Sequence, residues 1–118
     1  MRLRRVLCWG ATALVVAGCA SHLEAMPEVQ AFPFTGTTLN VESNGVPTDL
    51  VATERTDIKV TRWFSARSGV KDARWSLRDG TLDLVAQCGG FANCDARFEV
   101  EVPAGITVLR SGRPTQLR

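Results

Sequence analysis

The sequence has few of the residues from which most catalytic and metal centres are built. It contains one histidine, His22, and four cysteines among 118 residues. A structural zinc site needs about four His, Cys or carboxylate ligands held together, and His22 lies far along the chain from Cys88 and Cys94, so we interpret it as a solvated linker residue. Serines such as Ser65, Ser68 and Ser76 have no histidine motif nearby that would activate them. The sequence therefore predicts neither a metal site nor a cofactor.

Long apolar runs are also scarce, and the one present lies near the N-terminus. Arg2, Arg4 and Arg5 precede an uncharged apolar run over residues 6–18. These 13 residues are too few for a transmembrane helix, which needs about 20. A basic segment followed by a short apolar run is typical of an export signal peptide. We therefore expect residues 1–18 to be removed during export.

The apolar run ends in Val16-Ala17-Gly18-Cys19, which resembles the lipobox of bacterial lipoproteins. In such lipoproteins, small residues precede a cysteine that receives a diacylglyceryl group before the chain is cleaved ahead of it. Acyl chains contribute about 0.8 kcal/mol per buried methylene, so two or three chains hold a domain stably at a membrane. The resemblance implies lipidation of Cys19 and attachment to the extracytoplasmic face of the cell membrane. The alternative is an ordinary secretory signal with an incidental cysteine.

The mature chain lacks an excess of charge of either sign. Removing residues 1–18 takes three arginines with it and leaves 11 basic residues (14 − 3) against 12 acidic ones. No basic cluster remains that would favour binding to nucleic acid or to an anionic surface. The remaining 100 residues (118 − 18) are enough for one small domain, in the size range where a disulfide adds useful stability.

Two cysteines, Cys88 and Cys94, remain when Cys8 is discarded with the signal and Cys19 is assigned to lipid. An even pair outside the cytoplasm predicts a disulfide. The five residues between them do not match the two-residue spacing of thioredoxin-like redox sites. Both cysteines have the parity of core-facing residues, so we expect the loop over residues 89–93 to join them at the end of a hairpin. Closing so short a loop contributes about 2 kcal/mol in the chain-entropy model.

From Thr37 onward the chain alternates between short apolar–polar segments and turn residues, without a helical stripe. This pattern predicts an all-β fold of antiparallel hairpins or a meander. The preceding stretch has no such period and contains two prolines, so residues 19–36 are expected to form a lipid-anchored tether. We expect the β-rich domain to span residues 37–112 and a frayed tail to span residues 113–118.

The best-defined element is a hairpin around Asp79-Gly80, a dipeptide that favours a two-residue type I′ turn. Such a turn fixes the register of the two strands. The expected pairs are Leu77–Leu82 and Trp75–Leu84 on the core face, with Ser76–Asp83 and Arg78–Thr81 on the solvent face. The segment over residues 96–102 continues this division, with apolar residues facing the core and charged residues facing solvent.

Three aromatic residues, Trp63, Phe64 and Phe91, are candidates for a surface that binds a partner. In the segment over residues 57–64, Phe64 shares a face with other apolar residues that Arg62 interrupts, and Trp63 lies on the opposite face. The strand is therefore expected either to be covered on both sides or to expose an aromatic residue. The alternative to a binding role is that these aromatic residues pack in the core or cover a sheet face.

Acid–base catalysis would have to use Asp79, Asp83, Glu99 or Glu101. Asp79 is explained by the turn, and the other three alternate outward opposite arginines, as on a solvated sheet face. A glycosidase needs two carboxyl groups about 5–10 Å apart in a cleft, and a small flat sheet supplies no cleft. We therefore predict no catalytic residues.

The order of these segments resembles a bacterial adhesin-like domain family of unknown function, over about residues 35–112. The motifs that carry the resemblance are Leu39-x-Val41, Asn44-Gly45-Val46, Ile58-x-Val60, Asp79-Gly80-Thr81-Leu82-x-Leu84, Cys88, Cys94 and Phe98-x-Val100-x-Val102-Pro103-Ala104-Gly105-Ile106-x-Val108. The resemblance implies an envelope module that binds an envelope protein or a polysaccharide, without catalytic residues. The alternatives are a passive accessory subunit of an envelope complex and a small envelope hydrolase.

The chain departs from that family after Ser111-Gly112-Arg113-Pro114, where members continue through further β-solenoid rungs. A solenoid generally needs at least three stacked units with caps. The domain is therefore expected to be either a reduced single-sheet domain or the start of a short β-solenoid in a truncated chain.

Overall fold

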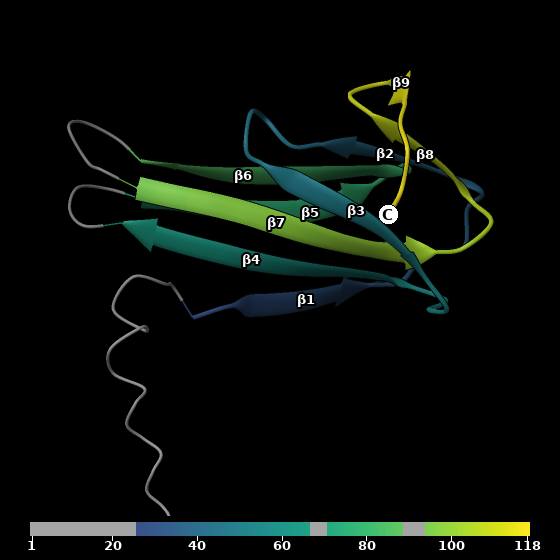
Figure 1. Ribbon diagram of the computed structural model, residues 1–118, viewed down its shortest axis with the longest axis horizontal. Helices are drawn as coiled ribbons and strands as arrows, with labels where there is room; N and C mark the ends of the chain where they lie inside the picture. Colours follow the sequence, from purple (N-terminus) through teal and green to yellow (C-terminus); the bar gives the residue numbers. More distant parts are fainter. Residues whose placement is uncertain (1–25, 67–70, 89–93) are drawn as a thin grey trace, which may run out of the picture.

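The computed structural model describes residues 26–66, 71–88 and 94–118, which form nine β-strands in two facing sheets (Figure 1). The strands are β1 (Glu28–Phe32), β2 (Thr38–Glu42), β3 (Thr48–Thr53), β4 (Ile58–Ala66), β5 (Lys71–Arg78), β6 (Thr81–Cys88), β7 (Cys94–Pro103), β8 (Thr107–Arg110) and β9 (Arg113–Pro114). The predicted all-β fold is confirmed. Within these three ranges, no helix has the length and apolar character needed to span a membrane.

Both sheets mix parallel and antiparallel pairs. The first sheet has the strand order β1-β4-β7-β3 and the second has the order β5-β6-β2-β8-β9. Parallel pairing joins β3 to β7 and joins β2 to both β6 and β8, whereas the other neighbours are antiparallel. The consecutive strands β2 and β3 therefore lie beside the consecutive strands β6 and β7. β2 pairs with β6 in the second sheet, and β3 pairs with β7 in the first. The expected start of a solenoid stays a prediction.

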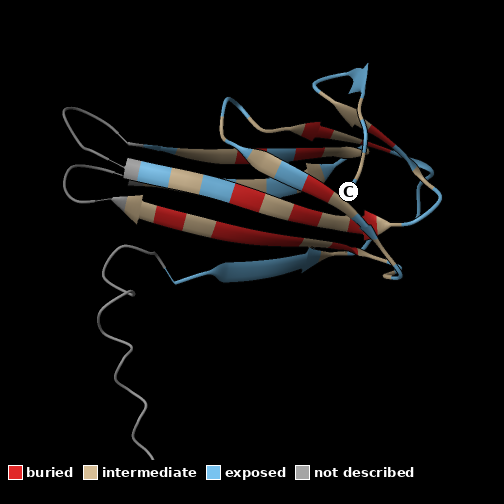
Figure 2. Cartoon of the chain, viewed as in Figure 1, coloured by how far each residue is buried: buried red, intermediate tan, exposed pale blue. Residues whose placement is uncertain are grey.

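The core lies between the two sheets and is built from alternate positions of their strands. Ten side chains from both sheets are less than 2% exposed: Phe98, Leu39, Leu50, Ile58, Leu82, Leu84, Val41, Val60, Val100 and Val102. Along β7, buried residues alternate with more exposed ones (Figure 2). Full burial of each such side chain stabilises the fold by about 1.5–3 kcal/mol, so the packing of one sheet on the other dominates stability.

The β5–β6 hairpin has the register that the sequence predicts. The Cα partners include Leu77–Leu82, Trp75–Leu84, Ser76–Asp83 and Arg78–Thr81. The turn residues Asp79 and Gly80 have φ values of 53° and 78°. Positive φ at both central positions is the requirement of a type I′ turn, so the predicted turn is confirmed.

Replacing Gly80 with alanine is expected to lower the free energy of unfolding by about 1 kcal/mol. A Cβ at position 80 would meet only the carbonyl oxygen of Thr38, at an ordinary 3.5 Å, so the cost arises from the left-handed backbone rather than from a clash. Urea denaturation followed by tryptophan fluorescence measures the loss. Asp79→Asn is the matched control and should be neutral, because asparagine tolerates positive φ. An unchanged midpoint for Gly80→Ala would contradict this account of the turn.

Two expectations about the ends of the domain are corrected. The segment over residues 19–36 contains β1, which pairs with β4 at one edge of the first sheet, so it is not a tether throughout. The segment over residues 113–118 contains β9 and is not frayed. The backbone N–H of Arg118 donates to the carbonyl of Leu50 at 2.9 Å, and that of Ala52 donates to the carbonyl of Arg118 at 3.1 Å.

The expected hairpin that joins Cys88 to Cys94 is wrong. Cys88 ends β6 in the second sheet, where it pairs with Lys71, and Cys94 begins β7 in the first sheet, where it pairs with Ala66. Alternation correctly predicts which face of β7 meets the core, but it does not specify the neighbouring strand. The loop over residues 89–93 and the side chains of both cysteines lie outside the described part of the structure, so the disulfide stays a prediction.

Candidate functional site

The structure does not gather the predicted aromatic residues on one surface. Phe64 is only 7% exposed and belongs to the interior, so it is withdrawn from the candidate surface. Trp63 is half-buried on the outer face of the first sheet, where the guanidinium carbon of Arg97 lies 3.9 Å from its ring centroid. Phe91, like the predicted lipidation site Cys19, lies outside the described residues.

The four candidate acid–base carboxylates also do not converge. Asp79 and Asp83 belong to the second sheet and its hairpin turn, whereas Glu99 and Glu101 lie on β7 in the first sheet. Asp83 and the two glutamates alternate with buried residues of their strands, so they point away from the core, from opposite outer faces of the sandwich. Glu99 and Glu101 lie two positions apart on one outer face, and Asp83 lies on the other, so the structure does not bring all four carboxylates together.

The most unusual group in the interior is an arginine on the core-facing side of β4. Arg62 is 8% exposed and sits opposite Glu28 in the β1–β4 register. Its Nε and Nη2 atoms donate to Oε1 of Glu28 at 2.9 and 2.7 Å. Its guanidinium carbon lies 4.0 Å from the ring centroid of Trp75 on β5. One side chain therefore connects β1, β4 and β5 across both sheets.

The remaining guanidinium nitrogen of Arg62, Nη1, is buried and has no hydrogen-bond partner in the described structure. An unsatisfied buried donor generally costs about 1–3 kcal/mol, partly offset here by the cation–π contact with Trp75. Phe32 packs edge-on against the same indole, with centroids 6.5 Å apart and an interplanar angle of 84°. This cluster closes the side of the sandwich where β1 and β5 are the edge strands, which is a structural role.

The sequence indicates one member of the ion pair in this cluster but not the other. Arg62 interrupts an otherwise apolar face, which marks it as an unusual residue. Its partner Glu28 lies in the segment that the sequence predicts to be a tether, so the ion pair could not be inferred without knowing that β1 exists.

A hollow of about 600 Å³ lies between the β1–β2 connection and the turn that joins β3 to β4. It is open to solvent. Its lining combines apolar residues with hydroxyl and carboxylate groups: Ala31, Pro33, Phe34, Thr35, Thr56 and Asp57. Sequence reasoning missed this site because five of its six lining residues lie in two irregular connections, which carry no periodic pattern, and the sixth, Ala31, lies in the unpredicted β1.

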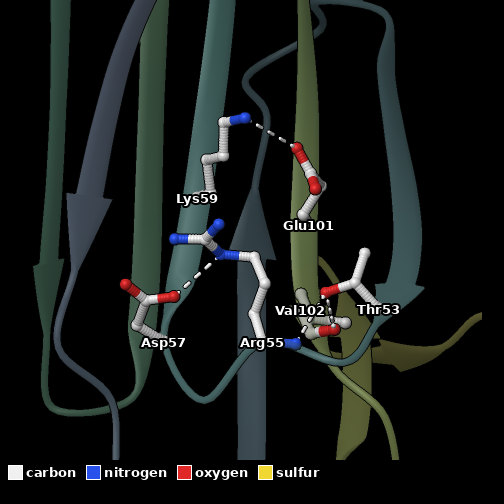
Figure 3. Close-up of polar contacts among 6 residues, drawn as sticks. All are labelled: Thr53, Arg55, Asp57, Lys59, Glu101 and Val102. Carbon is white, nitrogen blue, oxygen red and sulfur yellow. Dashed lines mark hydrogen bonds and ion pairs between the residues drawn. The ribbon is translucent and has the colours of Figure 1, made fainter.

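Polar contacts define the shape of the β3–β4 turn beside the hollow (Figure 3). Arg55 donates from Nε to Oδ1 of Asp57 at 2.8 Å and from its backbone N–H to Oγ1 of Thr53 at 3.2 Å. The hydroxyl of Thr53 donates in turn to the carbonyl of Val102 on β7 at 3.2 Å. These contacts tie the turn to the first sheet and orient the Asp57 carboxylate.

A second ion pair lies next to this turn, where Nζ of Lys59 is 3.5 Å from Oε2 of Glu101 (Figure 3). The two pairs balance the charges near the hollow. All four side chains are 23–34% exposed, and ion pairs of this kind contribute at most about 1 kcal/mol each. Across the described ranges, no group of three or more potential metal ligands occurs.

Comparisons with known proteins find no relative: no family model, no curated protein and no solved structure matches the chain. The adhesin-like resemblance therefore stays a prediction.

Proposed function

We propose that the chain is a lipid-anchored protein of the bacterial cell envelope, whose β-sandwich is a binding module without catalytic activity. The anchor is the acylated Cys19, at the extracytoplasmic face of the membrane. The observation that carries the proposal is the sequence of three N-terminal arginines, an uncharged apolar run over residues 6–18 and the Val16-Ala17-Gly18-Cys19 motif. Each part of this pattern serves one step of export and acylation.

The position of the first strand supports an anchor close to the domain. β1 begins at Glu28, so residues 19–27 are the link between the acylated residue and the sandwich. A fully extended chain spans at most about 3.3–3.6 Å per residue, which limits this link to about 30 Å. The binding surface would therefore operate close to the membrane.

The arrangement of polar groups supports binding rather than catalysis. The candidate carboxylates are divided between two outer faces, and the buried Arg62 is paired with Glu28 and covered by Trp75. The hollow beside the β3–β4 turn offers one carboxylate and two hydroxyl groups, which is a recognition site rather than a pair of acid–base groups.

Partition between detergent and water tests the anchor. We expect the full chain, expressed in a bacterium and extracted with a detergent that separates on warming, to enter the detergent phase. The control is the same mature sequence exported behind an ordinary secretory signal without a lipobox, which should stay in the aqueous phase. Recovery of both proteins in the aqueous phase would contradict the proposal.

A further inference from the structure

We infer that the hollow between the β1–β2 connection and the β3–β4 turn binds a neutral carbohydrate. This inference rests on the proposed function, because it names the class of ligand that the module binds. The lining of the hollow combines apolar side chains with hydroxyl groups and a carboxylate. This combination suits the two kinds of surface on a pyranose ring, which has a face of C–H groups and a circumference of hydroxyl groups.

The apolar part of the lining consists of Ala31, Pro33 and Phe34. Phe34 is partly buried and packs against the core. It also packs closely on Gly36, where an added Cβ would lie 3.1 Å from Cζ of the phenyl ring. The ring is thus held by the core on one side and by a glycine backbone on another. A side chain that is already ordered loses little conformational entropy when a ligand binds.

The polar part of the lining offers hydrogen-bonding groups that the protein itself does not use. Within the described ranges, the hydroxyls of Thr35 and Thr56 form no hydrogen bond, and the carboxylate of Asp57 is engaged only through Oδ1, by Arg55. The second carboxylate oxygen is therefore an acceptor for a ligand hydroxyl, and each threonine both donates and accepts. A hydrogen bond to a carboxylate is about twice as strong as one between neutral groups.

The charges around the hollow favour an uncharged ligand. Arg55 compensates Asp57, and Lys59 compensates Glu101. A phosphorylated or polyanionic ligand would face the carboxylate of Asp57, and a cationic one would approach Arg55 without finding an excess of negative charge. The charges near the hollow therefore favour neither an anionic nor a cationic ligand, and recognition depends on hydroxyl groups.

The size of the hollow favours a small ligand over a protein partner. Specific protein complexes bury about 1,600 Å² in total, far more than the six residues that line the hollow can supply. The volume of about 600 Å³ lies within the 300–1,000 Å³ that is usual for small-ligand sites. Because the site is open, one or two sugar rings would bind weakly. Many anchored copies on one polymer would raise the overall affinity.

Saturation-transfer difference NMR on the mature, lipidated protein in nanodiscs tests the inference. The probes are the neutral hexamers of glucose, mannose and N-acetylglucosamine, with hexaglucuronate as a charged comparison. We expect saturation of ring C–H protons in at least one neutral hexamer, and an affinity about tenfold lower for Asp57→Asn. Asp72→Asn is the matched control and should bind as the unmodified protein does, because Asp72 forms a similar pair with Arg74 on β5 of the other sheet.

Phe34→Leu provides a second variant that keeps the apolar volume but removes the flat ring. We expect it to weaken binding while the protein stays folded, as judged by its circular dichroism. The inference is overturned if no neutral hexamer is saturated, if hexaglucuronate binds more tightly, or if Asp57→Asn binds as well as Asp72→Asn does. Detergent partition separates the two proposals. Loss of sugar binding by a protein that still enters the detergent phase refutes only the carbohydrate site, and sugar binding by a water-soluble product refutes only the anchor.

Discussion

Replacing Glu28 with alanine is expected to lower the free energy of unfolding by about 2–3 kcal/mol. Arg62 is 8% exposed, so removal of its partner leaves an unpaired charge in the interior. Breaking a buried ion pair on one side costs about 3–5 kcal/mol. The Glu28 side chain is 59% exposed, so water compensates part of this loss, and we place the effect below that range. For a domain of this size the melting temperature would fall by about 10–20 °C.

Two further variants separate this ion pair from ordinary surface charges. Glu101→Ala is the matched control, because Glu101 pairs with Lys59 at 3.5 Å on the outer face of the same sheet, and it should cost less than about 1 kcal/mol. The double variant Glu28→Ala/Arg62→Met should recover most of the lost stability, because both charges are then absent and the methionine side chain can pack beside Trp75. Thermal unfolding followed by circular dichroism measures all three. A loss for Glu28→Ala no greater than that for Glu101→Ala would contradict the buried-pair account.

Replacing Cys19 with serine is expected to abolish both acylation and removal of residues 1–18. The acyl acceptor in lipoproteins is a thiol, and a serine hydroxyl is a much weaker nucleophile when no base activates it. Because cleavage follows acylation in the lipoproteins that the motif resembles, the variant should keep its signal. The test is growth with labelled palmitate, followed by capture of the protein and electrophoresis. The gel measures both the incorporation of label and the length of the chain.

The signal segment itself supplies the control for this experiment. Cys8 lies within the apolar run over residues 6–18 and should be discarded with it. Cys8→Ser should therefore incorporate label and be cleaved as the unmodified chain is. Label that persists in Cys19→Ser would refute the assignment of Cys19.

The parts of the fold that the sequence predicts correctly are those determined by local backbone chemistry and by alternation. Asp79-Gly80 requires positive φ at both positions, and that turn is enough to set the pairing of Leu77 with Leu82. The inward residues of β7 follow from strict alternation around Val100. Neither signal depends on knowledge of the rest of the molecule.

The parts that the sequence does not predict depend on contacts between distant segments. Four of the five residues of β1 are exposed. Glu28 contacts the buried Arg62 whereas Val29 is exposed, so the apolar residues of this short edge strand do not mark a core face. Strand β7 pairs with β4 and β3 rather than with β6. The sequence could not predict this pairing, because alternation assigns the faces of a strand but not its neighbours. The hollow joins two irregular connections, and the pair of Glu28 with Arg62 joins residues 34 positions apart.

The central claim is that acylated Cys19 is the N-terminus of the mature protein, and mass spectrometry of that terminus tests it most directly. A glutamate-specific protease releases the peptide over residues 19–24 from a mature chain that begins at Cys19. The account predicts this peptide with the added mass of a diacylglyceryl group or of a further acylated form. A mature chain that begins at another residue, or that carries an unmodified Cys19, would contradict it.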